Sequence, residues 1–116
     1  MRVVVITGNS GNRISSGYDI LSIPTQMTGQ AAEFFEKVKI LWRWLTASEV
    51  SVSVIAMINR YCFGAGLNLA MCCDIRIAAD HVKAGMPPVQ LEHGVSSGRT
   101  QPVCEVIGMA RTREIF

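Results

Sequence analysis

The sequence predicts an α/β fold in which parallel strands are joined by crossover helices. Two observations predict it. Short, continuous apolar runs of strand length alternate with segments of helical periodicity, which is typical of parallel β-α-β construction. A glycine-rich turn, Gly64–Gly66, also joins one of these apolar runs to a short helical segment. All 116 residues read as a single domain without repeats, low-complexity tracts or a linker.

The first predicted elements are a strand and a long helix. Arg2–Thr7 has the pattern of a buried strand, and Gly8–Asn12 has the composition of a turn-rich loop. Thr28 is a candidate N-cap for a helix that extends to Ala47. Apolar residues recur along this helix at three- and four-residue steps, which predicts one packed face. They are Ala31, Phe34, Phe35, Val38, Leu41, Trp42 and Leu45.

The second half continues the same alternation. Val52–Ile58 predicts a buried strand, Gly66–Cys73 a short helix and Ile75–Ala79 a further strand. Pro87-Pro88 marks a loop, and a helix is expected over Gln101–Phe116. The strand, glycine turn and helix in the middle of the chain form the most informative segment. At such a turn, backbone N–H groups can point at a ligand oxygen.

Composition excludes several classes of partner. A net charge of +2, with 49% hydrophobic and 17% charged residues, is ordinary for a single globular domain. The eleven Lys and Arg residues are scattered, so no nucleic-acid partner is expected. The apolar run after Met1 is too short for a secretory segment, and Val52–Ile58 is too short to span a bilayer. We therefore expect no membrane partner and a cytoplasmic or organelle-matrix setting.

The cysteines and histidines do not predict a metal centre. Cys62, Cys72 and Cys73 lie in apolar segments without C-x-x-C spacing, where cysteine commonly serves as a small hydrophobic residue. His81 and His93 are the only histidines, so no zinc site is expected. Cys62 adjoins the glycine turn and could be a nucleophile. No histidine stands at a spacing that would activate it, so packing is the favoured interpretation.

Several blocks of the sequence occur in the order and spacing of a known family. They are Arg2–Gly8, Ile14–Ile20, Val54–Gly66, Cys73–Asp80, Gly98–Gln101 and Val106–Arg111. On these blocks the chain resembles the crotonase (enoyl-CoA hydratase/isomerase) superfamily. The resemblance implies the core of that family's ββα superhelix. It also implies that the N- and C-terminal parts of the family fold are missing, so residues 1–116 are expected to form a single partial crotonase-like domain.

The resemblance also implies an acyl-CoA site. In the family, the thioester carbonyl lies between two backbone N–H groups, and the matching residues here are Tyr18 and Ala65. The reaction passes through a thioester enolate, and each preorganised donor in such an oxyanion hole contributes on the order of 3 kcal/mol. Ala65 replaces a glycine, which would strain the chain if its φ were positive. The resemblance implies substrate contacts at Ser16, Gly17, Asp19, Gly64 and Gly66.

Two substitutions separate this chain from hydratases of the family. Their two catalytic glutamates correspond here to Asn68 and Pro88. Neither residue exchanges a proton near neutral pH, and each lost acid or base is typically worth about 10²–10⁴-fold. Ordinary hydration is therefore not expected. Asn68 could bind a substrate carboxylate or carbonyl through its amide, or it could be structural.

Decarboxylation is the favoured alternative. Loss of CO₂ from a malonyl-type thioester gives the same enolate and needs an oxyanion hole but no base. Gly17–Pro24 and Met86–Leu91 resemble the corresponding segments of methylmalonyl-CoA decarboxylase-like members. Those members place a tyrosine near Val95, which this chain lacks. His93 or Glu92 could donate the proton instead, although each is more typical of an exposed loop residue.

Two hypotheses about function follow. The first is an acyl-CoA lyase or isomerase of fatty acid metabolism, with CoA carried by the substrate, no separate cofactor and no metal. The second is a catalytically inactive fragment or assembly module that retains the crotonase core. Either form is expected to self-associate, as the family trimer or hexamer, because a partial core leaves strand edges and apolar faces uncovered.

Overall fold

A computed structural model of the chain describes residues 2–9, 13–17, 29–46, 51–86 and 97–115. Within these ranges the elements follow the order β-β-α three times. They are β1 (Val3–Thr7), β2 (Arg13–Ser15), α1 (Gly29–Thr46), β3 (Ser53–Ile58), β4 (Tyr61–Phe63), α2 (Ala65–Met71), β5 (Ile75–Ala78), β6 (Lys83–Gly85) and α3 (Ser97–Ile115). This repeat is the ββα superhelical order that the resemblance implies. None of the helices in these ranges has the length and hydropathy to cross a membrane.

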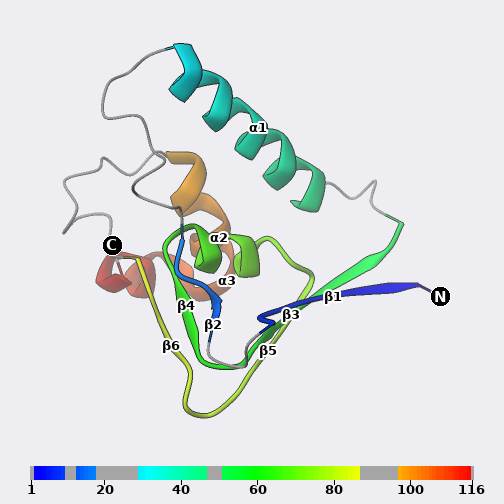
Figure 1. Ribbon diagram of the computed structural model, residues 1–116. Helices are drawn as coiled ribbons and strands as arrows, with labels where there is room; N and C mark the ends of the chain where they lie inside the picture. Colours follow the sequence, from blue (N-terminus) through cyan, green and yellow to red (C-terminus); the bar gives the residue numbers. More distant parts are fainter. Residues whose placement is uncertain (1, 10–12, 18–28, 47–50, 87–96, 116) are drawn as a thin grey trace.

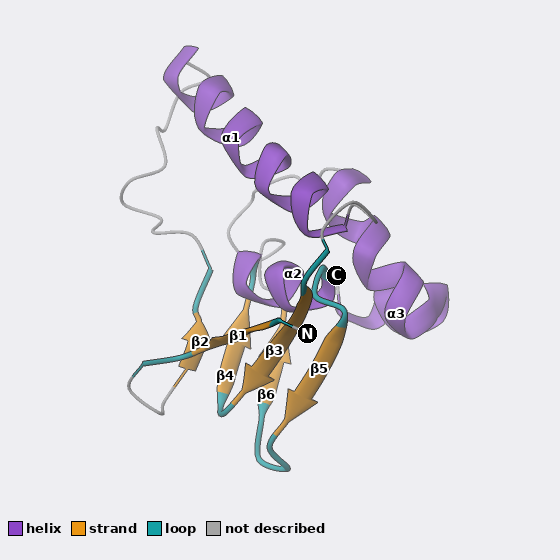
Figure 2. Ribbon diagram, turned by 90° about the vertical axis from the view of Figure 1, so that its right-hand side faces the viewer, coloured by secondary structure: helices purple, strands orange, loops and turns teal. Residues whose placement is uncertain are grey.

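The strands form two parallel sheets, β1-β3-β5 and β2-β4-β6. Each sheet takes one strand from every β-β-α unit, so the chain winds in a spiral (Figure 1). In the first sheet, Val5 pairs with Ile55 and Ile55 pairs with Ile75. Helix α2 lies against the strands, whereas α1 extends away from them (Figures 1 and 2). The predicted α/β class with parallel strands is confirmed.

The first sheet, α1 and α2 match the predicted segments to within two residues, whereas α3 begins at Ser97 and not at the predicted Gln101. Helix α1 lies within the predicted 28–47, and β3 and β5 match their predicted ranges to within a residue. The second sheet was not predicted, because each of its strands has only three residues. A strand this short shows no alternation that a sequence pattern could reveal. The predicted loop at Pro87-Pro88 and residues 10–12 of the first predicted loop lie outside the described ranges.

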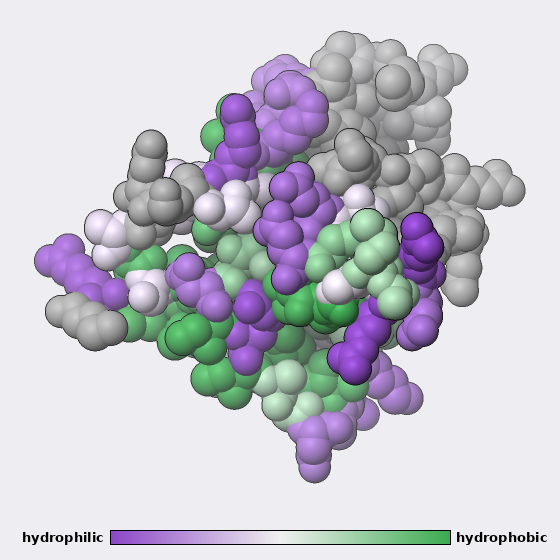
Figure 3. Space-filling model, turned by 180° about the vertical axis from the view of Figure 1, so that it is seen from behind, coloured by the Kyte–Doolittle hydropathy of each residue, from purple (hydrophilic) through white to green (hydrophobic). Residues whose placement is uncertain are grey.

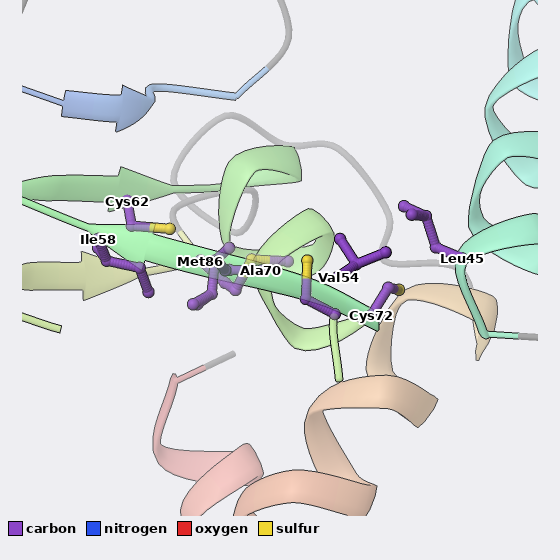
Figure 4. Packing of buried hydrophobic residues seen from close by; sticks show 10 residues of the cluster. Leu45, Val54, Ile58, Cys62, Ala70, Cys72 and Met86 are labelled. Carbon is purple, nitrogen blue, oxygen red and sulfur yellow. The ribbon is translucent and has the colours of Figure 1, made fainter. Parts of the chain in front are cut away.

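The core lies on the inner face of the first sheet, against α2. Alternate residues of β3 point to this face and are buried, and they contact the buried face of α2 and the nearby cysteines (Figure 4). The cluster is Leu45, Val54, Ala56, Ile58, Cys62, Leu67, Ala70, Cys72, Cys73 and Met86. Each fully buried large aliphatic side chain stabilises the fold by about 1.5–3 kcal/mol. The core therefore anchors the strand-turn-helix segment singled out in the sequence.

The expectation that the first strand is buried is wrong. Val3, Val4 and Val5 are 47%, 47% and 52% exposed, because the described residues leave the outer face of β1 uncovered and Val4, on its inner face, lines an open cavity. Met57, Ile75 and Ile77 continue this exposed apolar surface across β3 and β5. We call Val3, Val5, Met57, Ile75 and Ile77 the outer apolar face. Figure 3 shows hydrophobic atoms, in green, gathered across the lower part of one side of the molecule.

Helix α1 packs less of its apolar face than its periodicity predicts. Leu45 is buried and Trp42 packs against the core, as expected, but Leu41 is 47% exposed. The side chains of residues 31, 34 and 35 lie outside the description. Between α1 and the first sheet is an apolar cavity of about 570 Å³, lined by Val4 and Trp44 among others. The partial contact between this helix and the sheet leaves this cavity open.

The last helix is interrupted, which its predicted range did not anticipate. Gly108 within α3 has φ 79° and ψ 163°, a conformation that is essentially restricted to glycine. No atom lies within 4 Å of a Cβ built at this position, so the backbone and not the available space demands glycine. The hydroxyl of Thr112 donates to the Gly108 carbonyl at 2.8 Å. This bond satisfies a carbonyl at the break between the two helical segments.

Candidate functional site

The glycine turn is held in place from both sides. Gly64 follows β4 with φ 56° and ψ −126° and is the N-cap of α2. Its N–H donates to the Gly85 carbonyl of β6 at 3.0 Å. Its carbonyl accepts from the N–H groups of Leu67 and Asn68 at 3.1 and 3.2 Å. The turn therefore links the end of the second sheet to the start of α2.

Ala65 is the first residue of α2, and its N–H belongs to the first turn, where no intrahelical acceptor exists. Among the described residues, this N–H donates to no backbone carbonyl outside its helix. The positive φ of the turn falls on Gly64, so Ala65 has helical backbone angles. Alanine in place of glycine therefore introduces no strain at this position.

Gly17 brings the first β-β-α unit to this turn. It has φ 103°, and its N–H donates to the Ser15 hydroxyl at 3.1 Å. A Cβ built on Gly17 would lie 3.4 Å from the backbone nitrogen of Ala65. The structure thus places Gly17 directly beside the Ala65 amide, although they are far apart in sequence. Tyr18 and Asp19 lie outside the described residues, so the second predicted donor stays a prediction.

Ser15 is a residue of the site that sequence reasoning missed. A Cβ built on Gly66 would lie 2.4 Å from the Ser15 Cβ and 3.0 Å from the Ser15 carbonyl oxygen. Glycine at position 66 therefore lets α2 approach β2 closely. Ser15 thus contacts Gly66 and also fixes the Gly17 N–H. The signal that could have found it is the Ser-Ser-Gly sequence at residues 15–17, a pattern that favours side-chain-to-backbone turns. The neighbouring Ser16 is exposed.

Asn68 lies one helical turn after Ala65 and is fully buried, with 0% exposure. Neither its Nδ2 nor its Oδ1 atom has a hydrogen-bond partner among the residues that the structure describes. Leaving a buried polar group unsatisfied costs about 1–3 kcal/mol. Side chains on a helix lean toward its N-terminus, which here is the Gly64–Ala65 turn. Pro88 and His93 lie outside the described residues.

The C-terminal end of α2 is fixed by two charged residues. The Asp74 carboxylate accepts from the Val54 N–H at 2.7 Å, which ties the segment after α2 to β3. The Arg76 guanidinium donates to the carbonyls of Ala70 and Met71 at 3.4 and 3.3 Å. These carbonyls belong to the last turn of the helix, where a cation is favourable. Both ends of α2 are therefore anchored, which holds Ala65 and Asn68 in place.

The cysteines near the site are packing residues. Cys62 is 0% exposed, and burial raises the pKa of its thiol to about 11. Burial raises the pKa of the Cys72 thiol to about 11 as well. Both thiols are neutral at physiological pH and lack the thiolate that a nucleophile needs. In the described part of the chain, no three His, Cys, Asp or Glu side chains are grouped so as to hold a metal ion.

These buried thiols predict a loss of stability in alkaline solution. In the unfolded chain a thiol titrates near its ordinary pKa of 9.0, whereas Cys62 and Cys72 titrate near 11 in the folded protein. Below the unfolded value both states keep the proton. Above it the unfolded chain loses protons that the folded chain retains. The free energy of unfolding should therefore fall with rising pH by up to about 1.4 kcal/mol per pH unit for each thiol.

Urea unfolding at a series of pH values from about 8 to about 10.5 measures this decline. The double variant Cys62→Ala, Cys72→Ala is the matched control, and its stability should depend less steeply on pH. An equal slope in the variant and the parent protein would contradict the assignment.

The comparisons with known proteins agree on one family. The family model described as enoyl-CoA hydratase/isomerase matches residues 1–116. The crotonyl-CoA hydratase of Syntrophomonas wolfei is 32% identical over 116 residues, which are 100% of this chain and 44% of that protein. The short-chain-enoyl-CoA hydratase of Clostridium acetobutylicum is 30% identical over 97% of this chain and 42% of its own length.

A solved structure supports the same fold. The crystal structure of an enoyl-CoA hydratase/carnithine racemase from Magnetospirillum magneticum has a TM-score of 0.87 and 29% sequence identity. The similarity covers 100% of this chain and 43% of that one. The chain therefore spans less than half the length of the relatives named here.

Proposed function

Because the chain belongs to the enoyl-CoA hydratase/isomerase family, we propose that it binds an acyl-CoA thioester and stabilises the enolate formed from it. The observation that carries the proposal is the junction of Gly17 with the Ala65 amide. In the proposed complex the Ala65 N–H donates to the thioester oxygen, and the Tyr18 N–H is the second donor. Ser16 and Asp19 contact the substrate, and CoA enters as part of it.

Decarboxylation is the proposed reaction in preference to hydration. In this step the bond between the α-carbon and the carboxylate carbon breaks, its electron pair forms the enolate, and CO₂ leaves. A proton from solvent or from His93 then adds to the α-carbon. The support comes from the sequence, because Asn68 and Pro88 stand where hydratases carry glutamates. The local resemblance to methylmalonyl-CoA decarboxylase-like members points the same way.

The test is to incubate the protein with malonyl-CoA and, separately, with crotonyl-CoA. We expect CO₂ release from the first and no loss of enoyl absorbance from the second. Hydration of crotonyl-CoA at an ordinary enzymatic rate would overturn the preference for decarboxylation. No turnover of either thioester by the folded protein would overturn the catalytic proposal.

A catalytically inactive fragment or assembly module is the second candidate. It is supported by the resemblance, which assigns Asn68 and Pro88 to the two glutamate positions, and by the match to less than half of the length of the named relatives. Such a protein would retain the family core and affinity for CoA. Its signature is a higher thermal unfolding temperature in the presence of CoA, with no turnover of either thioester.

Self-association is proposed for either candidate. Its support is the outer apolar face, which is formed by Val3, Val5, Met57, Ile75 and Ile77 and is continuous across three strands. Apolar surface of this kind typically marks an interaction site. Size-exclusion chromatography with light scattering should find a trimer or hexamer. A stable monomer at a moderate concentration would contradict the proposal.

A further inference from the structure

The buried amide of Asn68 is the polar group that the described structure leaves least explained. Its backbone is fully used, because its N–H donates to Gly64 and its carbonyl accepts from the Cys72 N–H at 3.0 Å. Within the described part of the chain, the carboxamide of Asn68 remains without a partner. An apolar side chain with the branched shape of leucine would avoid the cost of a buried unsatisfied amide at this position. The unpaired amide therefore lowers the stability of the free protein, and a bound group that pairs with it could restore this stability.

The described residues around Asn68 do not supply that partner. The two charged groups that hold the C-terminal end of α2 are engaged elsewhere, since Asp74 accepts from Val54 and Arg76 donates to carbonyls at that end of the helix. Asn68 and Ala65 are three residues apart, so they lie on the same side of α2. The lean of the side chain directs the amide toward the turn where the thioester is proposed to bind.

We propose that Asn68 is a specificity-determining residue that selects acyl groups carrying a carbonyl or carboxylate oxygen on C3. This inference rests on the proposed function. The Nδ2 atom donates to the C3 oxygen, which satisfies a group that an alkyl chain would leave unpaired. A site with a buried polar group discriminates strongly against ligands that cannot pair with it. The substrate class is therefore a malonyl-type or 3-oxoacyl thioester and not a simple saturated one.

The neutral side chain of Asn68 supports the same class of substrate, the malonyl-type and 3-oxoacyl thioesters. The ionised form of a glutamate at position 68 would repel the carboxylate of a malonyl group. The neutral carboxamide of Asn68 donates a hydrogen bond without this repulsion. A 3-oxoacyl group carries no charge. Comparing its affinity with that of a malonyl group therefore separates the contribution of the hydrogen bond to binding from the contribution of charge.

The test measures the affinities of the whole chain for CoA, butyryl-CoA, acetoacetyl-CoA and malonyl-CoA by titration calorimetry. We expect the protein to prefer acetoacetyl-CoA and malonyl-CoA over butyryl-CoA by about tenfold.

Asn68→Leu should abolish this preference and raise the thermal unfolding temperature, because it removes the unsatisfied amide. Asn68→Asp should weaken malonyl-CoA binding more than acetoacetyl-CoA binding. Leu69→Val, on the next residue, is the matched control and should keep the preference.

The outcomes separate this inference from the proposed function. An unchanged preference in Asn68→Leu, together with a lower unfolding temperature, would assign Asn68 a structural role and overturn the inference alone. If leucine prevents folding, Asn68→Ala provides the same comparison without added bulk. Absence of binding to CoA and to every thioester by the folded parent protein would overturn the proposed function, and the inference with it.

Discussion

Replacing Ala65 with proline is expected to reduce CO₂ release from malonyl-CoA by about 10²–10³-fold while leaving the fold intact. Proline removes the backbone N–H, and loss of one donor from an oxyanion hole typically has an effect of this size. The first position of a helix tolerates proline because the N–H there has no intrahelical acceptor. Ala65 occupies this position in α2. The substitution therefore tests the donor directly.

Steady-state decarboxylation rates measure the effect, and thermal unfolding checks the fold. Ala65→Ser is the matched control, because it changes the side chain and retains the N–H, and its rate should stay near that of the parent protein. Full activity in a folded Ala65→Pro variant would show that this amide does not stabilise the reacting oxygen.

The second large effect is expected for Gly66→Ala, which should destabilise the protein by about 1–3 kcal/mol. The added Cβ would lie 2.4 Å from the Cβ of Ser15 and 3.0 Å from its carbonyl oxygen. Neither atom is the end of a flexible side chain, so β2 and α2 must move apart. That movement also displaces Gly17 from Ala65. Urea unfolding measures the loss of stability, and CoA titration measures the loss of the site.

The double variant Ser15→Gly, Gly66→Ala offers a direct check, since it removes the Ser15 Cβ that the new methyl group would meet. We expect it to recover part of the stability that Gly66→Ala loses, which a double-mutant cycle quantifies. Gly85→Ala is a milder control because its Cβ would lie 3.3 Å from the edge of the Phe63 ring. A Gly66→Ala variant as stable as the parent would contradict the close packing of α2 on β2.

The sequence predicted the first sheet and the helices because their patterns extend over several residues. Strands β3 and β5 have continuous apolar runs, and α1 has a long helical periodicity. The second sheet escaped prediction because its strands are three residues long and β2 pairs with β4 through an irregular register. The exposure of β1 was also unpredictable, since an apolar run indicates a strand but not what covers it.

The candidate site was predicted in part for a similar reason. The pairing of Gly17 with the turn at Gly64 followed from the resemblance, and the structure brings the two glycines together. The role of Ser15 depends on contacts between segments about fifty residues apart, which no local pattern records. The missing partners of Asn68 are likewise a property of the packed structure. The roles of all the predicted site residues, Ala65 and Asn68 included, stay predictions.

The β-β-α repeat has a consequence for how the site can be altered. The junction draws Gly17 from the first unit, Gly64 and Ala65 from the second, and the Gly85 carbonyl from the third. The chain thus behaves as a short solenoid in which each turn is in register with the next. The geometry of a site assembled across three consecutive turns therefore depends on the strand register of all three. Slippage by one residue in a single strand would separate the amide from its neighbours even if every turn remained folded.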